Sequence, residues 1–154
     1  MNRVDGKQGE HLLVLYVSEV NKSVMNALRH AKLLSGRRVG VHVMNSSDAK
    51  GIADQWKRHV PDVPLFILDS PNDSLLDPLA EFVDEIRHRH EGGTVTLLLP
   101  VISGLKWWQR FLHNQTERLI EKAFQSKAGV VTVRVPFSIA ADSHRELQHQ
   151  GKGI

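Results

Sequence analysis

Short apolar runs alternate along this chain with segments that have helical spacing. Five runs are rich in Val, Leu and Ile, and are bounded by Gly, Pro or polar residues. Such runs are typical of strands that are buried on both faces of a sheet. They cover residues 12–17, 39–44, 64–68, 94–99 and 130–135.

The segments between these runs carry apolar residues at intervals of three and four. Asn21 or Ser23 can cap the first helix, and Gly36 ends it. Pro61 ends the second helix, and Pro78 fits the first position of the third. The stripes that predict four helices are Val24, Leu28 and Ala31; Ile52, Trp56 and Val60; Leu79, Phe82, Val83 and Ile86; and Leu119, Ile120, Ala123 and Phe124.

Strict alternation of strands and helices predicts an α/β three-layer sandwich, with a five-stranded parallel sheet covered by helices on both sides. We expect the flavodoxin-like strand order. The domain should occupy residues 11–137, with the polar segments 1–10 and 140–154 as flexible ends. Ligands of such sheets bind outside the carboxyl ends of the strands. The loops to consider are therefore 18–22, 45–48, 69–74 and 101–113.

The loop before the last helix is unusually long. About a dozen residues separate Leu99 from Asn114, whereas most such loops have about two to six. Trp107 and Trp108 lie in it, and either serve a site or form a short helix that packs on the sheet. Asn114 and Glu117 have capping-box spacing, so we expect the last helix to begin at Asn114.

The residues around this predicted helix start have anion-binding chemistry. His113, Asn114, Gln115 and Thr116 offer an imidazole, two amides and a hydroxyl. Free backbone N–H groups and the helix dipole favour an anion such as phosphate at this position. The same Asn114 is equally well explained as a helix cap without a ligand.

Composition narrows the function classes. The chain has 154 residues, 41% hydrophobic, with no Cys and a net charge of +3. It therefore has no disulfide framework, no thiol nucleophile and no run of about 20 apolar residues, and because residues 1–10 are polar and mixed in charge we expect no signal peptide. The chain has no run of like charges of the kind that binds nucleic acid, so we expect no nucleic-acid partner. With no Gly-x-Ser-x-Gly elbow and no chelating His pair, we expect neither an enzyme nor a metal site.

A first resemblance concerns the second strand and the long loop. Residues 41–43 (Val-His-Val) and the loop before the last helix resemble the universal stress protein fold. Nucleotide-binding members of that family carry Gly-x-x-Gly, nine residues and Gly-Ser/Thr at this loop. Here Ser103-Gly104 has no second glycine, and His113-Asn114 stands where the Gly-Ser/Thr pair falls. Ser18 stands where those proteins usually have an Asp that contacts adenosine.

A closer resemblance covers residues 12–137. Its pieces are 17–22, 41–43, 63–65, 69–75 and, most specifically, the Trp-Trp-x-x-x-Leu-His-Asn-Gln-Thr string at 107–116. Together they resemble the C-terminal cytosolic domain of bacterial APC-superfamily permeases, the amino-acid permease-like proteins that include KimA-type potassium importers of the KUP family.

This resemblance implies a regulatory, universal-stress-protein-like domain at the cytoplasmic face of the cell membrane. It implies a homodimer, a transmembrane permease portion in the same polypeptide, and inhibition by cyclic di-AMP. The chain is then either an excised cytosolic domain or a free-standing relative. Family members often have Ser-Pro-Tyr-Arg after the third strand, where this chain has Ser-Pro-Asn-Asp at 70–73.

The leading hypothesis is that an adenine nucleotide, namely cyclic di-AMP, ATP or AMP, binds at the carboxyl edge of the strands. Lys22, Lys106 and Arg110 are candidates for charge pairing with its phosphates. The proposed contacts are Ser18, Val20, Asn21 and Lys22 around the base or ribose; the backbone of His42, Val43 and Met44 against the adenine; Ser70 after the third strand; and Ser103, Gly104, His113, Asn114 and Thr116 at the phosphates.

Two other functions remain open. The chain could be a dimerising scaffold without a ligand, in which the edge strand 129–135 pairs across a two-fold axis. The missing glycine and the Asn-Asp pair at 72–73 favour this alternative. The chain could also be a free-standing ATP- or AMP-binding protein of the universal stress type.

Overall fold

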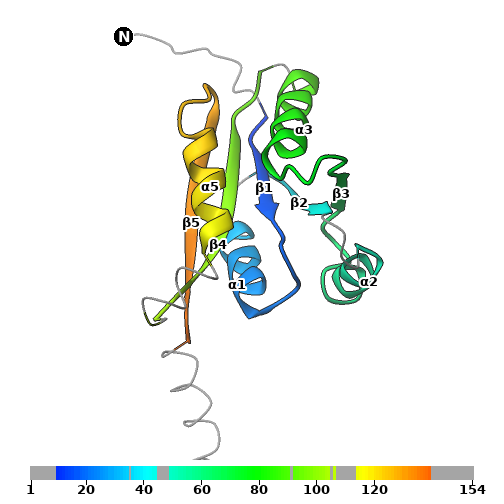
Figure 1. The fold of residues 1–154 in the computed structure, drawn as a ribbon, viewed down its shortest axis with the longest axis vertical. Coiled ribbons are helices and arrows are strands. Elements are labelled where there is room, and N and C mark those ends of the chain that lie inside the picture. Colours follow the sequence, from blue (N-terminus) through cyan, green and yellow to red (C-terminus); the bar gives the residue numbers. More distant parts are fainter. Residues whose placement is uncertain are drawn as a thin grey trace, which may run out of the picture.

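The computed structural model describes residues 10–34, 36–44, 49–90, 92–104, 106 and 114–139. Within them, strands and helices alternate strictly, as the sequence predicts (Figure 1). The elements are β1 (Leu12–Tyr16), α1 (Lys22–Ala31), β2 (Arg37–Met44), α2 (Ala49–His59), β3 (Leu65–Asp69), α3 (Leu76–Arg89), β4 (Val95–Ser103), α5 (Gln115–Phe124) and β5 (Val130–Ser138).

All strand pairs are parallel, and the five strands form one sheet in the order β3-β2-β1-β4-β5. The α/β three-layer architecture is thus confirmed, but the flavodoxin-like strand order is wrong, because that order is 2-1-3-4-5. The chain adds β2 and β3 on one side of β1 and then places β4 on its other side. Apolar runs alone do not distinguish the two orders, because in both the inner strands are buried on both faces.

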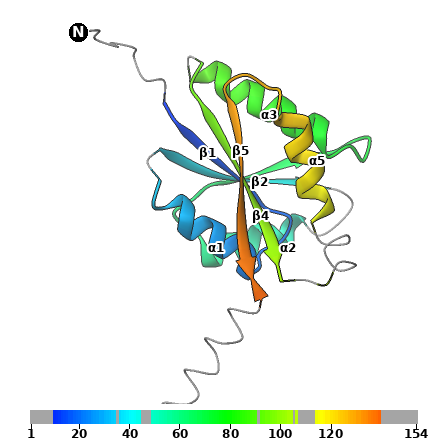
Figure 2. The ribbon, with the colours of Figure 1, turned by 90° about the vertical axis from the view of Figure 1, so that its left-hand side faces the viewer.

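Two apolar layers hold the helices against the sheet. Alternate residues of β1, such as Val14 and Tyr16, face α3 and α5, where Leu79 and Phe124 are buried. The other residues of β1 face α1 and α2 and contact a second cluster that includes Trp56. Figure 2 shows the helices in these two pairs, with α3 and α5 on one side of the sheet and α1 and α2 on the other. Both predicted faces are therefore confirmed as buried.

Helix ends agree with the sequence in part. Asn21 caps α1, as predicted, because its side-chain oxygen accepts a hydrogen bond of 3.0 Å from the Val24 N–H. Helix α3 begins at Leu76, so Pro78 lies in its first turn rather than at its first position. Within the described residues, no helix is both long and apolar enough to cross a membrane.

Candidate functional site

The strand order reverses between β1 and β4. These two strands are neighbours in the sheet, although β2 and β3 lie between them in sequence. In open parallel sheets the loops that leave two such strands diverge, and a crevice opens at their carboxyl ends. The loop after β1 runs to α1, and the loop after β4 runs to α5. These two loops therefore frame the place where this fold binds ligands.

A hollow of about 370 Å³ lies at the carboxyl end of β4, between that strand, β5 and the start of α5. We call it the β4–α5 hollow. Its volume lies at the lower end of the range of about 300–1,000 Å³ for small-molecule sites. Its lining combines apolar side chains, two arginines and polar groups: Val101, Ile102, Ser103, Gly104, Asn114, Glu117, Arg118 and Arg134.

Asn114 ties the start of α5 to β4. Its side-chain oxygen accepts a 3.1 Å hydrogen bond from the Ile102 N–H, and its amide nitrogen donates a 2.8 Å bond to the Ile102 carbonyl. The predicted capping box is wrong in this respect, because Asn114 makes no side-chain bond to the helix N–H groups. An amide matches the donor and acceptor of one extended residue at once, whereas a cap uses only its oxygen.

A second, smaller hollow of about 40 Å³ lies between the loop after β1 and the end of β4. We call it the β1–β4 hollow. Ser18, Asn21 and Ser23 line one side of it, and Asn114 and Glu117, which also line the larger hollow, line the other. Its volume is close to that of one water molecule. The two hollows therefore adjoin at the α5 start, and the smaller one accepts a single small polar group.

Glu117 places a buried carboxylate between the two hollows, with 6% of its surface exposed. Tyr16, at the end of β1, is buried in the same layer. Burial raises the pKa of the Tyr16 hydroxyl well above its usual value, and the negative charge of Glu117 raises it further. Tyr16 is therefore neutral at physiological pH.

Arg118 and Arg134 are functional candidates that the sequence analysis missed. Arg118 follows Asn114 by one helical turn, and Arg134 lies on β5 opposite Leu99 of β4. Arg134 also forms an ion pair with Glu121 of α5. The sequence does hold one signal for Arg134. Alternate residues of a strand lie on the same face, so Arg134 shares the face of Val130 on β5. A search limited to loops overlooks cations that reach the hollow from inside a helix and a strand.

Three of the predicted contacts gather at the β4–α5 hollow, namely Ser103, Gly104 and Asn114. Ser18 lines the β1–β4 hollow, together with Asn21. Thr116, one residue into α5, is partly buried. His113 and Arg110 lie outside the described residues.

The second-strand residues do not present side chains to these hollows. His42 is buried, and its Nδ1 lies 2.7 Å from the Val17 carbonyl oxygen. Val43 is part of the apolar core below α3 and α5. Met44, at the end of β2, is partly buried. The side chains of His42 and Val43 are therefore used in packing, whereas the predicted contact between adenine and the backbone of this segment stays a prediction.

The remaining predicted contacts line separate hollows. Ser70 donates a 2.7 Å hydrogen bond to the Ser74 carbonyl oxygen, in a hollow of about 260 Å³ after β3. That hollow is acidic, because Asp69, Asp77 and Glu81 line it. Val20 and Lys22 line another hollow, of about 480 Å³, beside α1.

The β4–α5 hollow combines two arginines and the start of a helix with the buried carboxylate of Glu117. Guanidinium groups bind phosphate oxygens through parallel hydrogen bonds, and the first N–H groups of a helix add fixed donors. No group of three metal-ligating His, Asp or Glu side chains occurs in the part of the chain that the structure describes. The fold defines a small α/β domain with a hollow at the carboxyl ends of its strands.

Comparison with known proteins identifies the family. The chain belongs to the family of KimA potassium transporter C-terminal domains, which matches residues 9–137. It is similar to the potassium transporter KimA of Bacillus subtilis (strain 168), with 26% identity over 142 residues. The similarity covers 88% of this chain and 23% of that relative, so the chain spans about a quarter of the transporter's length.

Proposed function

We propose that this chain is the cytosolic regulatory domain of a bacterial APC-type permease that carries potassium or amino acids, and that it binds an adenine nucleotide such as cyclic di-AMP. Membership of the KimA C-terminal domain family supports the link to a transporter. The named relative is a potassium transporter, which favours potassium as the solute. The domain then lies at the cytoplasmic face of the cell membrane, joined to the transmembrane portion, and catalyses no reaction.

The observation that carries the nucleotide proposal is the β4–α5 hollow. Arg118 and Arg134 line it together with the polar groups of Ser103 and Asn114. Gly104 has a φ of +79°, a left-handed conformation that leaves its backbone without a side chain where a phosphate would approach. The Ser103 hydroxyl already donates to the Phe137 carbonyl oxygen at 3.3 Å, so the two guanidinium groups are the chemistry in this hollow that recognises a phosphodiester.

Charge limits how strongly the hollow binds phosphate. The buried carboxylate of Glu117 faces the same space, and Arg134 is already paired with Glu121. Arg118 therefore carries the largest share of the attraction in this proposal. Each phosphodiester of cyclic di-AMP carries one negative charge, and one such group suits this balance better than the triphosphate of ATP. The charges around the hollow therefore favour cyclic di-AMP among the three nucleotides.

Titration calorimetry with cyclic di-AMP, AMP and ATP tests the proposal. Arg118→Gln should weaken binding of cyclic di-AMP at least about tenfold, since one charge-assisted pair is worth about 1.5–3 kcal/mol. Lys122→Gln is the matched control, because Lys122 lies exposed on the same helix and does not line the hollow. Absence of heat with all three nucleotides, or equal loss in both variants, would overturn the proposal. Tight binding of ATP alone would favour the free-standing ATP-binding alternative.

The second candidate function is a dimerising scaffold, and β5 favours it. This nine-residue strand is an edge of the sheet, and Val131 and Val133 are 51% and 38% exposed. A long apolar edge strand readily pairs with another chain. Two copies that pair along β5 across a two-fold axis would join their sheets. Sedimentation velocity of the wild type and Val131→Lys tests this, and a wild-type monomer at micromolar concentration would exclude it.

A further inference from the structure

The turn between α1 and β2 exposes two neighbouring leucines. Leu33 is 81% exposed and Leu34 is 45% exposed, although both follow directly on the buried Ala31 at the end of α1. Leu33 is the most exposed of the large apolar side chains in the described residues. Since the apolar face of α1 is already buried against the sheet, these leucines contribute little to the core.

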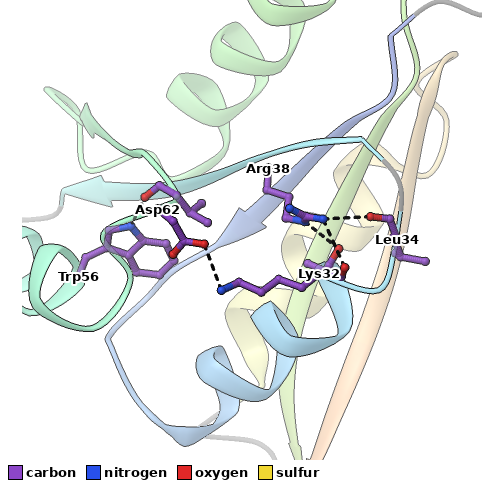
Figure 3. Close-up of polar contacts among 7 residues, drawn as sticks. Lys32, Leu34, Arg38, Trp56 and Asp62 are labelled. Carbon is purple, nitrogen blue, oxygen red and sulfur yellow. Dashed lines mark hydrogen bonds and ion pairs between the residues drawn. The ribbon is translucent and has the colours of Figure 1, made fainter.

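Arg38 holds this turn in place. Its Nε donates a 3.0 Å hydrogen bond to the Ala31 carbonyl, and its Nη2 donates to the carbonyls of Lys32 and Leu34 at 3.3 and 3.4 Å. Figure 3 shows Arg38 on β2 reaching across to these carbonyls. The last carbonyls of a helix have no partners within it, so Arg38 satisfies them and fixes the path of the chain. Arg38 thus ties the backbone of Lys32 and Leu34 to β2.

Three cations flank the two leucines in sequence. Lys32 directly precedes them, and Arg37 and Arg38 follow within four residues. Lys32 pairs with Asp62 at 3.2 Å, and Arg37 pairs with Glu10 at 3.5 Å. Three cations and two carboxylates leave a local charge of +1. Both acids are exposed at the rim, so an approaching anionic surface competes with them for the same cations.

We propose that this leucine tip, defined as Leu33 and Leu34 with Lys32, Arg37 and Arg38, docks on an anionic lipid bilayer. The leucines enter the boundary between headgroups and acyl chains, and the cations lie over the lipid phosphates. Exposed apolar side chains ringed by Lys and Arg are the combination that binds membrane interfaces. The proposal uses the membrane location from the proposed function, but it needs no nucleotide.

The position of the tip agrees with this occupant. The Arg37 N–H donates to the His11 carbonyl at 3.1 Å, so the tip lies at the edge of the sheet where the chain enters β1. This family is the C-terminal domain of its transporters, so their preceding polypeptide reaches the domain at that same edge. Two leucines on a narrow turn suit insertion between headgroups better than a flat protein interface, which needs a larger apolar patch.

A site-specific fluorophore tests the contact directly. The chain has no cysteine, so Leu33→Cys provides a unique attachment point for an environment-sensitive dye. Leu119→Cys is the matched control, because Leu119 is a 52% exposed leucine on α5, a helix on the opposite face of the sheet from α1 (Figure 2). With phosphatidylcholine vesicles that contain about 30% phosphatidylglycerol, we expect a blue shift at position 33 only. Equal spectra at both positions, or no dependence on phosphatidylglycerol, would overturn the proposal.

Vesicle cosedimentation of unlabelled protein gives the affinity. Leu33→Ser with Leu34→Ser should reduce binding to the same anionic vesicles at least about tenfold, and Leu119→Ser should leave it unchanged. Added salt should weaken wild-type binding, because the cations contribute through screened attraction. Binding that the double variant retains in full would overturn the proposal. So would a wild-type dimer that dissociates in this variant, since the leucines would then be a contact between protein chains. Nucleotide binding to Arg118 is measured without vesicles, so either proposal can fail without the other.

Discussion

The two ends of the parallel strands are built in opposite ways. We call the ends at which the strands terminate the carboxyl edge of the sheet, and the ends at which they begin the amino edge. At the carboxyl edge, strands end in side chains that line hollows, and Asn114 bonds to β4 without closing the space beside it. At the amino edge, backbone bonds join neighbouring strands directly, as between Arg37 and His11 or Val95 and Gly129. The first edge has the shape of a binding site, and the second has the shape of a closed seam.

Helix direction explains much of this contrast. Every helix starts at the carboxyl edge and ends at the amino edge, and α1, α2, α3 and α5 each carry a basic residue in the last turn. Cations there complement the negative end of the helix dipole. The positive charge of the amino edge therefore has a structural cause, whereas the exposure of Leu33 and Leu34 has none in the fold. The leucines, more than the cations, are what distinguish the leucine tip from an ordinary helix end.

The largest expected effect comes from a glycine in the amino-edge seam. Gly36 has a φ of +127°, and a Cβ there would lie 2.5 Å from the His11 carbonyl oxygen. Gly36→Ala should therefore lower the free energy of unfolding by about 3 kcal/mol, the upper end of the cost of a strained backbone position. Gly104→Ala at the carboxyl edge, with a φ of +79°, should cost only about 1 kcal/mol. Urea unfolding of both variants measures the difference, and equal costs would contradict the contrast between the edges.

The second effect concerns how the carboxyl edge holds α5. Asn114→Ala removes both bonds to Ile102 and leaves a strand N–H and carbonyl without these partners. We expect a loss of about 2 kcal/mol in the free energy of unfolding. Gln115→Ala, one residue along and exposed, is the control and should change stability by less than about 0.5 kcal/mol. If Asn114→Ala behaves like the control, Asn114 does not anchor the helix.

The sequence predicts the layers of this fold because burial leaves a direct periodic signal. The runs at 12–17 and 94–99 match β1 and the first part of β4, and the helix stripes match the buried faces. Strand ends were less predictable. β2 begins at Arg37 because Arg37 and Arg38 pair with Leu12 and Leu13 through the backbone, which places no demand on their polar side chains.

The residues of the candidate site could be predicted from the sequence only where they lie together in one loop. Ser103 ends β4 and Gly104 follows it, and both lie in the loop 101–113 that the sequence singles out after the predicted strand. Arg118 and Arg134 come from different elements, and their meeting depends on the pairing of β4 with β5. The wrong strand order had a similar cause, since the position of β4 beside β1 is a long-range contact. The side chain of His42 is buried, and the predicted backbone contact with adenine lies at the end of β2, one strand away from the crevice between β1 and β4.

The third effect is a loss of stability in alkali, and it arises at the carboxyl edge. Burial, helped by the charge of Glu117, raises the pKa of Tyr16 above its value in the unfolded chain. The folded state then keeps its proton where the unfolded state loses it, so stability is unaffected below about pH 10 and falls above it. The slope from Tyr16 is about 1.4 kcal/mol per pH unit. Urea unfolding between pH 8 and 11 should show a flatter decline in Tyr16→Phe, and parallel curves would exclude this role.

The smallest expected effect concerns Asp62, the carboxylate that pairs with Lys32 at the amino edge. The hydrogen bond from Lys32, shown in Figure 3, holds the pKa of Asp62 below its usual value, so Asp62 stays ionised throughout the physiological range. Asp62→Asn therefore raises the charge of the leucine tip by one at every such pH. Binding to anionic vesicles should increase by up to about fivefold, the worth of one cation near a charged surface. Asp54→Asn, on exposed α2, is the control for net charge alone. An equal increase in both variants would mean that the whole domain, rather than the tip, is attracted to the membrane.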